Sequence, residues 1–69
     1  MGMMQIRLNG VQREVEQGTN IAMLLQELKL DSRFLAVERN RALVPRGEHA
    51  RCLLIAGDEI EIVTLVGGG

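Results

Sequence analysis

The chain has 69 residues, enough for one small domain and too few for a second. Its 46% hydrophobic residues can form one core, and its 25% charged residues are typical of a folded chain rather than a disordered one. No apolar run approaches the roughly 20 residues of a membrane-spanning helix, and no secretory signal pattern begins the chain. We therefore expect a cytoplasmic protein that needs no membrane. A net charge of −1 argues against general nucleic-acid binding.

The single cysteine, Cys52, and the single histidine, His49, restrict the chemistry of the chain. One cysteine excludes an internal disulfide, a cysteine-based zinc site and a four-cysteine iron–sulfur cluster. A chain this short also leaves little room to enclose a substrate. We expect no catalytic residue, no metal site and no bound cofactor. Beside Leu53 and Leu54, Cys52 is expected to be a small buried hydrophobic residue, whereas His49 is expected at the surface of a polar loop.

An N-terminal hairpin is the strongest local prediction. Residues 1–3 include alternative start methionines, so they are left out of the fold argument. Residues 4–8 alternate apolar and polar side chains, which indicates a strand with one buried face. The dipeptide Asn9-Gly10 suits a type I′ turn because both residues tolerate positive φ. The alternating residues 11–16 complete the hairpin.

A short helix should follow the hairpin. Gly18 ends the second strand, and Thr19 or Asn20 can cap the helix. Four apolar side chains at the spacing i, i+3, i+4 and i+7 share one helix face, and they are Ile21, Leu24, Leu25 and Leu28. We interpret this stripe as the face that packs on the sheet of the same chain. A helix that binds a partner is the alternative.

Three further strands are expected after the helix. Residues 34–37 form an apolar run typical of a central strand, and a turn separates them from a brief strand at 42–44, which Pro45 ends. Residues 59–62 begin an alternating last strand.

The resulting order, β-β-α-β-β-β, predicts an α+β fold of the ubiquitin-like β-grasp type. One domain over residues 1–66 would hold a mixed sheet of about five strands with one helix across it. The first and last strands would be parallel central neighbours, since the long connection through the helix permits this.

The chain ends in Gly67-Gly68-Gly69, directly after the last predicted strand. Without side chains, these residues can enter a channel too narrow for other residues. The α-carboxylate of Gly69 is anionic at pH 7 and is a poor electrophile until a partner activates it, most simply by adenylation with ATP. We therefore expect Gly67 and Gly68 to form a flexible arm and Gly69 to be the reacting end. The alternative is an ordinary frayed terminus.

Several short pieces, in their order and spacing, resemble the ThiS family of sulfur carriers over residues 4–69. They are Ile6-Arg7-Leu8-Asn9-Gly10, the helix after Gly18-Thr19, Val37-Glu38-Arg39-Asn40, Val44-Pro45-Arg46, Gly57-Asp58 and the Gly68-Gly69 end.

The resemblance implies a pathway for sulfur. A ThiF-like adenylyltransferase would use ATP to adenylate Gly69, and sulfur from a cysteine desulfurase would convert the adenylate to a thiocarboxylate. A ThiG-like thiazole synthase would then take the sulfur for the thiazole moiety of thiamine.

Three alternatives stay open. MoaD-like carriers of molybdopterin synthase often have prolines shortly before the terminal glycines, whereas this chain has Thr64-Leu65-Val66 there, which favours the thiamine branch. A ubiquitin-like interaction module or an RNA-binding module would use a folded surface. Residues 33–51 carry five arginines against two glutamates, but Phe34 is the only aromatic residue, so we favour protein docking, or simply solvated charge, over RNA stacking.

Overall fold

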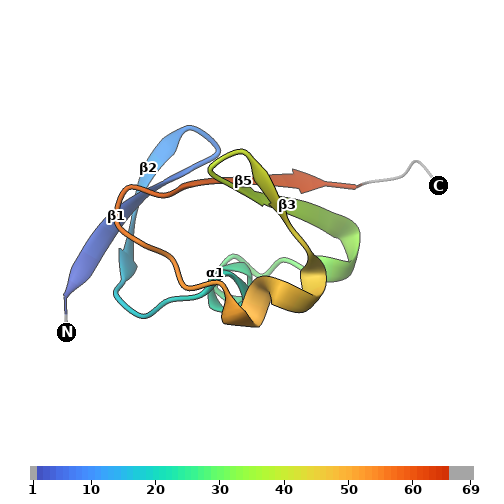
Figure 1. Ribbon diagram of the computed structural model, residues 1–69, viewed down its shortest axis with the longest axis horizontal. Helices are drawn as coiled ribbons and strands as arrows, with labels where there is room; N and C mark the ends of the chain where they lie inside the picture. Colours follow the sequence, from blue (N-terminus) through green and yellow to red (C-terminus); the bar gives the residue numbers. More distant parts are fainter. Residues whose placement is uncertain (1, 66–69) are drawn as a thin grey trace.

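Five strands form one mixed sheet in the computed structural model, which describes residues 2–65 (Figure 1). One α-helix, α1 (Ile21–Glu27), packs across the sheet, and two 3₁₀ helices, η1 (Ser32–Phe34) and η2 (Arg46–Arg51), lie in the connections. The strands are β1 (Met3–Leu8), β2 (Val11–Glu16), β3 (Leu35–Arg39), β4 (Ala42–Val44) and β5 (Glu59–Thr64).

The strand order is β2-β1-β5-β3-β4, with β5 in the centre. β1 pairs with β2 in the antiparallel sense and with β5 in the parallel sense, while β3 is antiparallel to both β5 and β4. The prediction that the first and last strands are parallel central neighbours is therefore confirmed, as is the α+β ubiquitin-like β-grasp.

The hairpin between β1 and β2 turns at Asn9 and Gly10, whose φ angles are 49° and 82°. Positive φ at both positions is what a type I′ turn requires, because its twist matches that of the two strands. Arg13 of β2 is half-buried, and its Nη2 lies 3.8 Å from Glu27 Oε1 of α1. At the turn end of β2, the Val11 side chain is exposed to solvent.

Asn20, one of the two predicted caps, begins α1. Its Oδ1 accepts a hydrogen bond from the Met23 N–H at 2.8 Å, which satisfies a free donor of the first helical turn. Thr19 is buried and does not cap the helix. The predicted apolar face is confirmed: three of its four members are buried, and Leu28 at the C-cap packs half-buried against them.

The core lies between α1 and the inner face of the sheet. Its central side chains, from the helix and from four strands, are each at most 2% exposed. They are Ile6, Val15, Ile21, Leu24, Val37 and Ile60. Because side chains alternate along a strand, the opposite face of β5 carries Glu59 and Glu61 into solvent, as predicted.

Two local predictions were wrong. Phe34 does not begin a strand: it ends η1 and is 58% exposed, and β3 runs instead from Leu35 to Arg39. His49 is not a surface residue but is buried, with its Nε2 3.2 Å from the Val44 carbonyl oxygen. The 3₁₀ helix η2 turns this one side chain inward while most of its polar neighbours face solvent.

Within residues 2–65, no helix has the length and apolar character needed to cross a membrane. In the same part of the chain, no three His, Cys, Asp or Glu side chains gather as metal ligands would.

Candidate functional site

The central strand β5 leads into the C-terminal segment that the sequence singles out. Gly67, Gly68 and Gly69 lie outside the described residues. The last described backbone bond is donated by the Leu65 N–H to the Phe34 carbonyl oxygen at 2.7 Å. The region around Phe34, Thr64 and Leu65 is therefore the last described part of the chain before the terminal glycines.

Two asparagines brace β5 from opposite sides. Asn9, at the end of β1, accepts from the Ile62 N–H through Oδ1 at 2.7 Å and donates through Nδ2 to the Ile62 carbonyl oxygen at 3.0 Å. On the β3 side, the Asn40 N–H donates to the Glu59 carbonyl oxygen, and Asn40 Oδ1 accepts from the Glu59 N–H at 2.9 Å. The side-chain amide of Asn9 thus takes the place of a backbone unit in the ladder, whereas Asn40 pairs with Glu59 through its backbone N–H and its side-chain oxygen.

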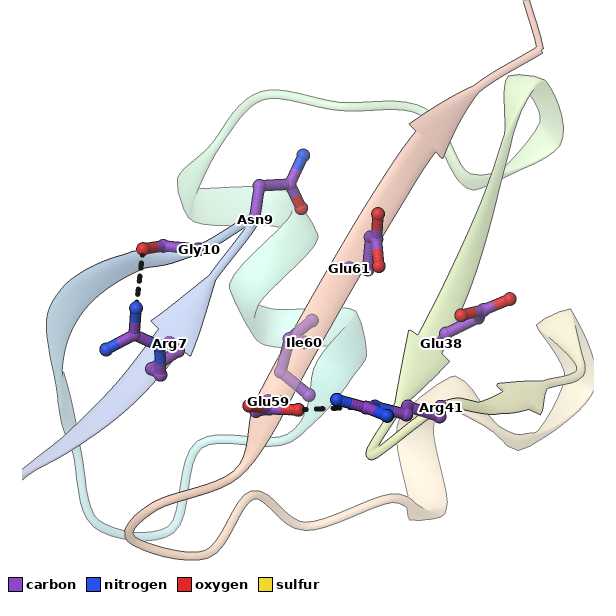
Figure 2. A pocket seen from close by; sticks show the side chains of 8 residues that line it. All are labelled: Arg7, Asn9, Gly10, Glu38, Arg41, Glu59, Ile60 and Glu61. Atoms are coloured by element: carbon purple, nitrogen blue, oxygen red, sulfur yellow. Dashed lines mark hydrogen bonds and ion pairs between the residues drawn. The ribbon is translucent and has the colours of Figure 1, made fainter.

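Both asparagines adopt the left-handed conformation, with φ of 49° at Asn9 and 50° at Asn40. Asparagine tolerates this region better than most side chains, so one residue both makes the turn and reaches across to β5. Figure 2 shows Asn9 at the end of β1, beside β5.

Asp58 fixes the start of β5 in a buried polar network. Its Oδ2 accepts from Arg39 Nε at 3.0 Å and from the Ile55 N–H at 2.8 Å, and its Oδ1 accepts from Asn40 Nδ2 at 3.1 Å. Burial lowers the pKa of Arg39, but its contacts with Cys52 and Asp58 outweigh this effect and raise the pKa above its ordinary value. The guanidinium therefore stays charged, and the buried carboxylate keeps its counter-charge.

Cys52 is half-buried rather than fully buried, although it packs against the core as predicted. Its Sγ lies 3.5 Å from Arg39 Nη1. Since the His49 ring bonds instead to the Val44 carbonyl, the hydrogen bonds of the described residues do not couple Cys52 and His49 as a nucleophile and base.

The outer face of the sheet is acidic over its centre. Glu38 of β3 lies directly opposite Glu61 of β5, and both surround a hollow together with Arg7, Arg41 and Glu59 (Figure 2). The one ion pair there, between Arg41 Nε and Glu59 Oε1, is long at 3.9 Å and solvent-exposed, so it contributes little stability. The hollow is lined mostly by charged side chains of the outer face.

Sequence reasoning missed Asn9, Asn40 and Asp58 as members of this site. It treated all three as turn residues, which they are, but the bonds from Asn9 to Ile62 span 53 positions in the sequence. No local pattern reports such a contact. Two pieces of the family resemblance, Gly57-Asp58 and Val37-Glu38-Arg39-Asn40, contain the side chains of the Asp58 network and were the signal that pointed toward it.

The chain is similar to known proteins over nearly its whole length. The ThiS family profile matches residues 6–69. A region of the thiazole synthase of Paramagnetospirillum magneticum is 41% identical to this chain over 66 residues, and one in the thiazole synthase of Magnetococcus marinus is 42% identical over 66 residues. Each match covers 96% of this chain but 20% of the relative, so the chain spans about a fifth of their length.

Among solved structures, the thiamine biosynthesis protein ThiS of Geobacter metallireducens superposes with a TM-score of 0.83 and 28% sequence identity. The match covers 96% of this chain and 100% of that one. With the β-grasp sheet, the central β5 and a family match that runs through the last residue, the chain belongs to the ThiS family.

Proposed function

We propose that the protein is a sulfur carrier for thiazole formation in thiamine biosynthesis, and that Gly69 carries the sulfur. The observation that carries this proposal is the extent of the ThiS match, which includes all three terminal glycines. The position of β5 supports it, because a strand held on both sides gives the terminal arm a rigid base.

The proposed chemistry takes place at the terminal carboxylate. A ThiF-like adenylyltransferase joins this carboxylate to the α-phosphate of ATP and releases pyrophosphate. A cysteine desulfurase supplies the sulfur as an enzyme-bound persulfide, whose terminal sulfur attacks the acyl carbon and displaces AMP to form an acyl disulfide. A thiol then reduces that disulfide and is itself oxidised to a disulfide, which leaves a thiocarboxylate on Gly69. A ThiG-like thiazole synthase accepts the sulfur, and the names of the two thiazole synthase relatives support this choice of partner.

In this proposal the chain is a carrier and the partners are the catalysts. ATP is a substrate of the activating enzyme, the carrier itself binds no cofactor, and the setting is the cytoplasm, where ATP is available. Gly67 and Gly68 form the arm that enters the partner active sites, because the absence of side chains lets the backbone pass through a narrow channel.

The test is conversion of the full chain by a ThiF-like enzyme, ATP and a desulfurase system, followed by intact mass spectrometry. The expected product is heavier by the difference between one sulfur and one oxygen atom. A variant with one alanine added after Gly69 retains a terminal carboxylate but places a side chain at the reacting end, and Gly68→Ala places one in the arm. Both variants should melt like the wild type and convert poorly.

Addition of a peptide tag before Met1 is the matched control and should leave conversion unchanged. Absence of any conversion of the wild-type chain, with an enzyme that converts a known ThiS, would contradict the carrier function.

A further inference from the structure

The edge of β5 nearest the terminal arm is not paired within residues 2–65. Bonded and non-bonded residue pairs alternate in an antiparallel ladder. The Asn40 N–H to Glu59 bond and the Leu65 N–H to Phe34 bond, both 2.7 Å, show that the odd-numbered residues of β5 face β3. The N–H and C=O groups of the even-numbered residues, including Thr64, therefore face the β1 side.

β1 is too short to cover this edge. Its pairing with β5 ends at Leu8 opposite Ile60, after which the Asn9 N–H donates to the Ile60 carbonyl at 2.8 Å. The side chain of Asn9 then occupies both backbone groups of Ile62. In the described part of the chain, Thr64 is next in line, and neither its N–H nor its C=O has a hydrogen-bond partner.

An apolar hollow adjoins this free edge. It has a volume of about 290 Å³ and lies where the end of α1 meets the sheet. No charged side chain lines it, and the lining residues are Leu8, Asn9, Leu28, Leu30, Ile62 and Thr64. An open strand edge beside an apolar hollow is the arrangement that binds an extended peptide, in which backbone bonds provide the pairing and an alternate side chain fills the hollow.

We propose that an extended segment of the thiazole synthase adds to β5 at Thr64 and places an apolar side chain in the hollow beside Leu30. This proposal rests on the function proposed above. The choice of partner is supported by the two relatives named thiazole synthase, in which a region similar to this carrier is part of the same chain. An enzyme that acts on Gly69 positions the sulfur best when it binds the carrier close to the arm. Few unrestrained residues then separate the bound strand from the reacting end.

Amide hydrogen exchange of the full chain, followed by NMR, tests the pairing directly. In the free protein, the Thr64 N–H should exchange quickly, whereas the Ile62 and Leu65 N–H groups, both hydrogen-bonded, should be protected. A saturating amount of thiazole synthase should slow the exchange of Thr64. Unchanged exchange at Thr64 in the saturated complex would overturn the proposal, as would protection that rises with carrier concentration alone, which would assign the edge to a second copy of this chain.

Substitution provides a second test. Thr64→Pro removes the N–H without breaking a bond in the sheet, so the fold should persist, and Thr64→Val is the matched control that keeps the N–H. We expect Thr64→Pro to bind the synthase at least about tenfold more weakly, and Thr64→Val to bind like the wild type. Equal binding of Thr64→Pro and the wild type would overturn the proposal.

A second pair of variants covers the case in which Thr64→Pro does not fold. Leu30→Glu places a charge in the hollow and should weaken binding, while Leu43→Glu changes an exposed side chain of β4 and should not. Weaker binding of Leu43→Glu together with unchanged binding of Leu30→Glu would move docking to the outer face and overturn the proposal. Conversion of the wild-type chain by the ThiF-like enzyme is measured in parallel: if conversion succeeds and the binding tests fail, only the edge proposal is wrong.

Discussion

Arg39 and Asp58 form an ion pair at the point where β5 begins, with Arg39 Nε donating to Asp58 Oδ2 at 3.0 Å. The Asp58 side chain is 7% exposed and also accepts hydrogen bonds from Ile55 and Asn40. One carboxylate therefore connects β3, the turn after it and the loop that precedes β5.

Asp58→Ala should lower the free energy of unfolding by about 3 kcal/mol, because it leaves a partly buried guanidinium and two donors without their acceptor. Urea denaturation measures the change. The control is Glu59→Ala, which removes only an exposed, long ion pair with Arg41 and should stay within about 0.5 kcal/mol of the wild type. Equal losses in the two variants would contradict the role assigned to the buried network.

The amide of Asn9 should stabilise β5 independently of its role in the turn. Asn9→Gly keeps the positive φ but removes both bonds to Ile62, and it should cost about 1–2 kcal/mol. Asn9→Ala should cost more, because alanine is also strained at this φ. Hydrogen exchange at the Ile62 N–H should accelerate in both variants, and an unchanged rate would show that the brace does not hold the strand.

Leu24 lies at the centre of the core and is 0% exposed. Leu24→Ala should lower the free energy of unfolding by about 2–5 kcal/mol, since it removes buried methyl groups and leaves a cavity. Met23, on the outer side of α1, is 42% exposed, and Met23→Ala should change stability by less than about 0.5 kcal/mol. Thermal melts of the two variants should differ clearly, and similar melts would contradict the assigned helix face.

The carboxyl of Asp31 should titrate unusually low. Side-chain hydrogen bonds from Arg33, and then the Arg33 backbone N–H, lower its pKa from 3.8 to about 2. Because the pKa is depressed in the folded chain, the stabilising contribution is present above pH 3.8 and is lost as the pH falls toward 2. An NMR titration of the carboxyl carbon measures this, and Arg33→Ala should return the pKa toward its ordinary value; an unchanged value in that variant would contradict the cause.

The local pattern of apolar and polar residues was sufficient to predict the strands and the helix that turn one face toward the core. Alternation predicted β1 and β5 because their inner faces pack against α1, and the spacing of Ile21, Leu24 and Leu25 predicted the buried helix face for the same reason. The parallel pairing of β1 with β5 was expected from the β-grasp element order, and the long connection through the helix permits it.

The remaining features depend on contacts between distant residues. The inward turn of His49 occurs within a polar segment, so composition alone favoured the surface. The braces made by Asn9 and Asn40 join turns to a strand formed much later in the chain. The open edge at Thr64 results from where β1 stops relative to β5, and that register is a property of the assembled sheet.

The central claim is that sulfur held on Gly69 becomes the sulfur of the thiazole. The most direct measurement is a single turnover, in which the chain is first loaded with heavy-isotope sulfur by the ThiF-like enzyme, purified, and then mixed with thiazole synthase and its other substrates. Mass spectrometry should show the label leaving the C-terminal peptide and appearing in the thiazole product in equal amount. A thiazole product formed without the label, while the carrier retains it, would contradict the claim.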